Sequence, residues 1–253
     1  MTPTPDRGSF DLLIEDAGTQ GCLGHVPALP GLNFRADTAT ELEKAAPARI
    51  REYAQWLSAG GLADLTPETA EVGSSGLRIV VAEHLAGAPV WDSGNAAVLF
   101  QWDLRPLDDR AVAARLRFVR RVLDRMRELI APLSSEQRSR RPAPDRRSVD
   151  ETLEHVGNCV WWYCSRIDDD LPEPDEPAGE DPLDRIDRLF EIAETFLFAV
   201  PLSARATVHV PARFPTADPN ERWTHTKACR RQAEHAWAHL CGLKRRVPEI
   251  RKE

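Results

Sequence analysis

Four stretches in the second half of the chain carry apolar residues at every third or fourth position. They cover residues 111–130, 148–167, 183–200 and 224–246. This spacing places the apolar side chains on one face of an α-helix, and that face must be buried against other elements. Hydroxyl residues able to cap a helix start stand before the second stretch, at Ser148, and before the fourth, at Thr224 or Thr226. The second half is therefore predicted to form four helices.

The first half has a different pattern, with short runs typical of β-strands. The runs are residues 10–15, 21–26, 33–35, 77–82 and 96–102. After the third run, Thr38 and Glu41 have the form of a helix capping box, and Gly60 ends the helical spacing. Pro47 lies inside that spacing, so we expect either a kinked helix or a later helix start. The fold class expected for the whole chain is α+β.

Charge is also divided unevenly between the two halves. Residues 1–109 carry 7 basic and 16 acidic side chains, whereas residues 110–253 carry 26 basic and 24 acidic ones. The change falls where the hydrophobic pattern changes, and it predicts a domain boundary near Leu107. An acidic first half argues against broad contact with nucleic-acid phosphates, so we expect no nucleic-acid partner.

The composition is that of an ordinary globular protein, with 42% apolar and 29% charged residues. No run approaches the ~18 uncharged apolar residues that a membrane span needs, and residues 1–7 do not have the form of a secretory signal. Five cysteines are too few, and odd in number, for a disulfide framework. We therefore expect a cytoplasmic protein without a membrane partner. Its 29 arginines against 4 lysines indicate a bacterial gene of high GC content.

Two histidines of the last predicted helix, His235 and His239, lie one helical turn apart. Their imidazoles project from the same face, so two neutral nitrogens can converge on one divalent ion. His155, in the second predicted helix, is the natural third ligand. Three imidazoles with an open position are typical of a catalytic zinc site, and imidazole also suits nickel and iron. By itself, however, the histidine pair is more often solvated or hydrogen-bonded in a core than bound to metal.

Other residues near this constellation are candidates for the wall of the site. Cys159 lies one turn after His155 and is either a fourth ligand or a buried apolar cysteine. Trp162 and His209 are expected to line the site, His209 from a long loop that follows the third predicted helix. His225, just before the fourth helix, is expected at the surface. The sequence assigns no catalytic residue.

Three segments of the second half resemble the DinB/YfiT-like superfamily. They are Leu133–Gln137, Ser148–Val156 and Trp223–His239. The resemblance implies an up-down four-helix bundle over residues 108–247, with His155, His235 and His239 as ligands of a divalent metal (Zn, Ni or Fe). Members with known chemistry are metal-dependent transferases and isomerases that use a low-molecular-weight thiol such as mycothiol or bacillithiol.

The first half resembles a HicB-like antitoxin domain. The shared pattern is the V-P-x-L-P-G turn at Val26–Gly31, followed by Asp37-Thr38 and an amphipathic helix. The resemblance implies a small α/β sandwich of β-β-β-α-β order within residues 8–107, with a strand extension, and a protein partner that cleaves RNA. The histidines of this half, His25 and His84, are expected at the surface or in packing roles.

These observations favour a metal-binding protein that transfers a low-molecular-weight thiol to a small electrophile. One alternative is a non-enzymatic interaction or stress-response protein that binds a partner through its HicB-like domain. A second is a metal-dependent hydrolase that uses a bound water. Bundles of this type often pair, so a homodimer is also expected.

Overall fold

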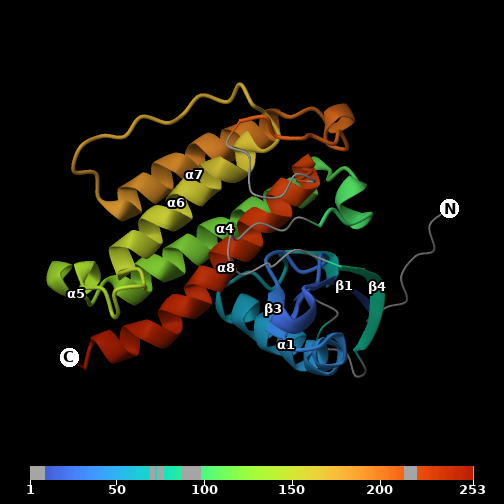
Figure 1. The fold of residues 1–253 in the computed structure, drawn as a ribbon, viewed down its shortest axis with the longest axis horizontal. Coiled ribbons are helices and arrows are strands. Elements are labelled where there is room, and N and C mark those ends of the chain that lie inside the picture. Colours follow the sequence, from blue (N-terminus) through green and yellow to red (C-terminus); the bar gives the residue numbers. More distant parts are fainter. Residues whose placement is uncertain (1–8, 69–71, 73–76, 87–97, 214–220, 253) are drawn as a thin grey trace.

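The computed structural model describes residues 9–68, 72, 77–86, 98–213 and 221–252. Its first half is a four-stranded mixed sheet with one long helix, α1 (Ala39–Ala59), and its second half is helical (Figure 1). The expected α+β class is confirmed.

The strands of the sheet lie in the order β3-β2-β1-β4. Strands β1 (Ser9–Asp16), β2 (Cys22–His25) and β3 (Asn33–Ala36) form an antiparallel meander. After α1 the chain returns as β4 (Arg78–Ala86), which pairs parallel with β1. This β-β-β-α-β order is the one that the HicB-like resemblance implies.

The fifth expected strand, 96–102, is wrong for the residues that the structure describes. Residues 98–102 form no strand, and residues 96–97 lie outside the described part. The backbone N–H of Phe100 donates to the Asp103 carboxylate at 3.2 Å, and the 3-10 helix η2 (Trp102–Leu104) follows. A side-chain acceptor three residues ahead thus turns the backbone out of the extended conformation.

Helix α1 begins where its cap predicts and continues through the proline. The Thr38 side chain accepts from the N–H of Glu41 at 3.2 Å, and the helix runs unbroken past Pro47, so the expected later start is wrong. A proline inside a helix costs about 3 kcal/mol. Buried residues on both sides of it, such as Ala46 and Ile50, outweigh that cost because they hold the helix against the sheet.

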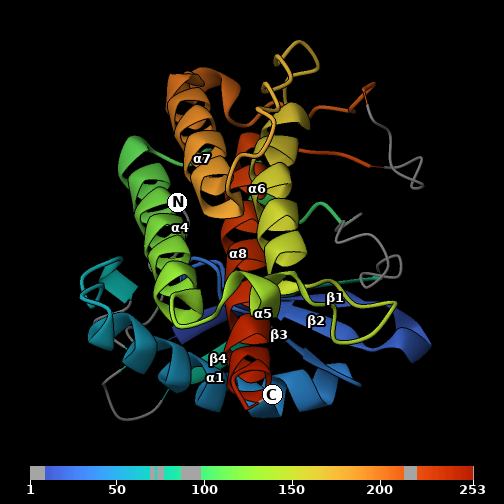
Figure 2. The same ribbon diagram turned by 90° about the vertical axis from the view of Figure 1, so that its left-hand side faces the viewer.

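In residues 98–213 and 221–252, the described part of the second half, four long α-helices and one short one form. They are α4 (Asp109–Ile130), α5 (Ser135–Ser139), α6 (Val149–Ser165), α7 (Pro182–Ala199) and α8 (His225–Ile250). Helix α8 lies between α4 and α6, and α7 packs along α6 (Figure 2). No helix in the described ranges combines the length and the apolar character that crossing a bilayer requires.

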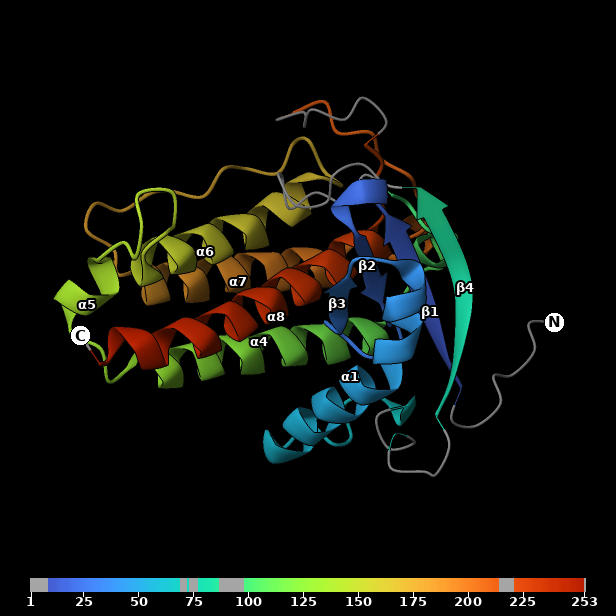
Figure 3. The same ribbon diagram turned by 60° about the horizontal axis from the view of Figure 1, so that its bottom comes forward.

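The two halves share one continuous hydrophobic core, and the sheet lies beside α4 and α8 (Figure 3). The turn between β2 and β3 is part of this contact. Gly31 has a φ of +83°, and a Cβ there would lie 2.2 Å from the Phe118 ring of α4, so only glycine fits. Arg115 of α4 donates to the carbonyl of Pro27 at 3.1 Å. The domain boundary near Leu107 stays a prediction, and packing across it is extensive.

A buried ion network also joins the sheet to α8. His25 of β2 lies between two carboxylates, with Nδ1 2.8 Å from Glu234 Oε1 and Nε2 3.4 Å from Glu15 Oε1. Arg230 donates to Asp103 at 2.7 Å and to Glu234 at 3.1 Å. All five side chains are buried. Charges this deep are tolerated only when each one faces a partner, so the network fixes how α8 sits on the sheet.

The His25 contacts predict a pH-dependent stability. Burial opposes protonation of His25, but the charge of Glu234 and the nearby carboxylate of Glu15 outweigh it and raise the pKa of His25 above 6.5. The stabilisation is therefore complete below pH 6.5 and is lost as the pH rises through the raised pKa. We expect His25→Gln to lower the free energy of unfolding by about 3 kcal/mol at pH 6, and by less at pH 9, in urea titrations.

His84→Gln is the matched control. His84 also pairs with a carboxylate, at 3.0 Å from Asp16, but both side chains are about one-third or more exposed. Its loss should change stability by less than about 1 kcal/mol. A His25→Gln deficit of equal size at pH 6 and pH 9 would contradict a protonated His25.

Candidate metal centre

Three imidazoles from two helices meet at one point. His235 and His239 follow each other by one turn on α8, and His155 projects from α6 opposite them. The Nε2 atom of His235 lies 3.1 Å from Nε2 of His155 and 3.0 Å from Nε2 of His239. The structure thus brings together the three histidines that the sequence singled out.

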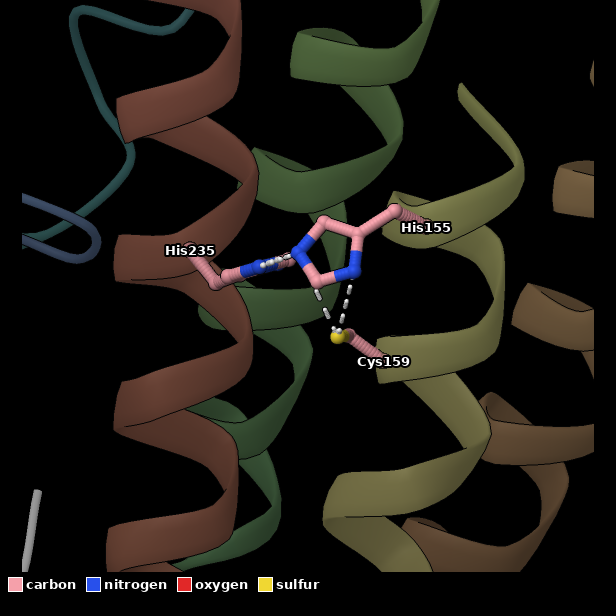
Figure 4. Close-up of side chains that lie close together, drawn as sticks. All are labelled: His155, Cys159 and His235. Carbon is pink, nitrogen blue, oxygen red and sulfur yellow. Dashed lines mark hydrogen bonds between the residues drawn. The ribbon is translucent and has the colours of Figure 1, made fainter. Parts of the chain in front are cut away.

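Cys159 completes the cluster from α6. Its Sγ lies 3.7 Å from Nδ1 and 3.8 Å from Nε2 of His155, one turn earlier on the same helix (Figure 4). His155, Cys159 and His235 each offer one ligand atom, and these atoms lie within 4.8 Å of one another. The sequence left Cys159 as either a fourth ligand or a buried apolar cysteine; in the structure its Sγ is within reach of an ion held by the histidines.

The donor atoms fit a divalent metal. Ligand nitrogens about 2.0–2.1 Å from a tetrahedral ion lie about 3.3 Å apart, close to the observed 3.0–3.1 Å. Imidazole nitrogen suits zinc, nickel and iron, and a thiolate suits zinc. The geometry supports a metal site without identifying the metal.

The protonation states also favour metal binding, since a histidine ligand must be neutral. Burial lowers the pKa of His155 to about 4 and that of His239 to about 3, and it lowers the pKa of His235 well below 6.5. At His235 and His239, repulsion from the neighbouring histidines and the charge of Arg147 lower the pKa further. At His155, the charge of Arg147 is the contribution that adds to burial. Burial raises the pKa of the Cys159 thiol to about 12. At pH 7 the imidazoles are therefore ready ligands, whereas the thiol keeps its proton until an ion displaces it.

The cluster lies in the wall of a pocket of about 1250 Å³. Helices α6 and α8 contribute the metal-site residues together with Trp161, Trp162 and Trp237, and β3 and α1 contribute the opposite side, including Phe34 and Trp56. Trp162 thus has the lining position that the sequence predicted. The contribution of the first half has no local sequence signal because it depends on how the sheet packs against α8.

The remaining two histidines of the second half lie elsewhere. His209 is not among the described residues that line the pocket; its backbone forms an isolated bridge with Trp223, with N···O distances of 2.7 and 2.9 Å. His225 was expected at the surface, and that expectation is wrong. It is buried, and its Nε2 lies 2.9 Å from the carbonyl oxygen of Leu197, because α7 covers the first turn of α8.

The choice between Cys159 and His239 as third ligand is testable by substitution. We expect His239→Ala to weaken metal binding by more than the roughly 10- to 100-fold typical of an outer-shell change. Cys159→Ser should weaken it by less than about 10-fold, because the thiol must first lose a strongly held proton. Competition against a chelating indicator at pH 7 measures both, with His209→Ala as the unchanged control. The reverse order of the two effects would make Cys159 the ligand and His239 a neighbour.

The comparisons with known proteins bear on the helical half. Residues 119–241 match the DinB superfamily, and this range contains the three histidines and Cys159. The chain has no significant match among curated proteins or among solved structures. Nothing in the comparisons supports a HicB-like domain in the first half. Residues 119–241, from the middle of α4 to the middle of α8, are therefore a DinB superfamily domain.

Proposed function

We propose that this protein is a metal-dependent enzyme that transfers a low-molecular-weight thiol to a small electrophile. The observation that carries the proposal is the convergence of three neutral imidazoles on the wall of a large pocket. The DinB superfamily match over the same residues supports it. The thiol is of the mycothiol or bacillithiol class, and the metal is zinc, nickel or iron.

The surroundings favour a catalytic over a structural role for the ion. Structural zinc sites are closed by four protein ligands, whereas catalytic sites keep a position for substrate. Here the ligands border a pocket of about 1250 Å³, which is ample for a small molecule. The helices that carry them are also packed by an extensive apolar core, so folding does not depend on an ion.

The residues of the pocket have separable tasks in this proposal. A divalent ion bound by the imidazoles would lower the pKa of a thiol beside it, so that the thiol would be present as a thiolate at neutral pH. Trp161 and Trp162 offer apolar surface that excludes water from the reacting sulfur. Arg147 places a positive charge near all three imidazoles, which also favours a thiolate over a thiol.

A protein partner of the first half stays a prediction, as does a homodimer. The V-P-x-L-P-G turn that motivates the partner is covered from inside the chain. Phe118 of α4 and the Ala233 carbonyl of α8 contact Gly31, and Arg115 binds the Pro27 carbonyl. A partner would therefore have to use another face of the sheet.

We predict that thiol transfer requires bound metal, whereas the folded structure of the protein does not. Protein loaded with zinc, nickel or iron is mixed with mycothiol or bacillithiol and a fluorogenic electrophile. We expect product with the loaded protein and none after chelation, while the helical circular dichroism stays unchanged.

His235→Ala, with His209→Ala as the matched control, tests the site in the same assay. The first variant should lose transfer and the second should keep it. Hydrolysis of esters without any thiol dependence would contradict the proposal and favour the hydrolase. Unfolding of the helical half on chelation would instead assign the ion a structural role.

A further inference from the structure

The pocket beside the metal centre is basic, although the chain as a whole carries a net charge of −7. Among the described residues that line it, seven are arginine or lysine and three are glutamate. We propose that the ligand that reacts there is an anion, and that the first half of the chain supplies part of the wall that selects it. This inference rests on the proposed function and adds the charge of its substrate.

The three glutamates of the pocket are already neutralised by neighbouring arginines. Glu52 lies 3.0 Å from Arg49, and Glu176 lies 2.8 Å from Arg185. Glu173 pairs with the guanidinium of Arg213, which is outside the lining. Arg231 is also offset, by Glu234 at 3.0 Å, so the glutamates of the lining and Glu234 leave the charges of Arg147, Lys244 and Arg245 to be considered.

Arg147 stands out among those charges. It lies just before the first turn of α6, its side chain is exposed, and it forms no ion pair within the part of the chain that the structure describes. It lines the same pocket as His155, His235 and His239. An anionic group held by Arg147 would therefore sit beside the metal centre.

Arg35 brings a second charge from the opposite side. It lies on β3 among the residues that line the pocket, with Phe34 of the same strand and Trp56 of α1. Burial, and after it the charge of Arg231, lowers the pKa of Arg35. Arg231 itself pairs with Glu234 at 3.0 Å. Arg35 and Arg147 thus bring positive charge into the same pocket from the two halves of the chain, and both would attract an anion there.

The first half thus serves as a wall of the site in this account. Small ligands are bound by mostly apolar pockets with a few placed charges, and the aromatic and cationic residues here come from both halves. The substrate class that fits is a molecule with one or more carboxylates and an apolar body. Either the thiol or the electrophile can carry the carboxylate, and the test uses the thiol.

The test compares two small thiols on the Co²⁺-loaded protein. Mercaptosuccinate carries two carboxylates and thioglycerol carries none, and both are followed by the thiolate-to-cobalt absorption band. We expect mercaptosuccinate to bind at least about 10-fold more tightly than thioglycerol at low salt, and this difference in affinity to shrink as salt is added.

Arg147→Gln and Arg35→Gln should each reduce the ratio of affinities by about 3- to 10-fold. Arg117→Gln removes the same charge outside the pocket, where Arg117 pairs with Asp64, and should not change the ratio.

A second arm separates this inference from the proposed function. Succinate is titrated by calorimetry into the metal-free protein, and binding that Arg147→Gln weakens supports the anion site even where neither thiol reaches the cobalt. Succinate binding without thiol binding to the cobalt would contradict thiol transfer and would still support an anion-binding pocket. Equal affinities of the two thiols, together with no binding of succinate, would overturn the anion preference and leave the thiol site intact. No succinate binding together with no thiol binding would overturn both.

Discussion

The buried contact between Glu234 and His25 sets the geometry on which the rest of the structure depends. Glu234 lies on α8 with its carboxylate 2.8 Å from His25 of β2, and Arg230 and Arg231 approach the same carboxylate at 3.1 and 3.0 Å. A buried carboxylate that lost these partners would be strongly unfavourable, and the shared charges hold its pKa far below the usual range. Helix α8 is therefore held at one rotation about its axis.

That rotation decides where the metal ligands point. Adjacent residues on a helix are about 100° apart, so Glu234 facing the sheet leaves His235 facing α6. His239 follows one turn later on the same face. One helix thus anchors the first half with one side and builds the metal centre with the other. The pocket between them takes residues from both halves as a consequence.

Local patterns in the sequence predicted a large part of this arrangement. The hydroxyl caps at Thr38, Ser148 and Thr224 mark the helix starts in the structure, because capping depends on residues within one turn. The i, i+4 spacing of His235 and His239 likewise fixes a shared face.

Features that depend on distant residues could not be predicted in this way. The sequence left His25 as a packing or surface residue, and nothing within one turn of it shows that Glu234, 209 positions later, is its partner. Two other features also depend on residues distant in the sequence. Helix α7 covers His225, and Arg35 of the first half lines the pocket. The continuation of α1 through Pro47 also depends on burial against the sheet and not on local propensity.

The central claim is that the three histidines form a metal site, and the metal content of the protein tests it most directly. The protein is purified without chelator or nickel affinity resin, beside a variant that combines His155→Ala, His235→Ala and His239→Ala. The account predicts about one equivalent of a divalent metal in the wild type and none in a variant that remains folded. A well-folded wild type that holds no metal, even after zinc, nickel or iron is added, would contradict it.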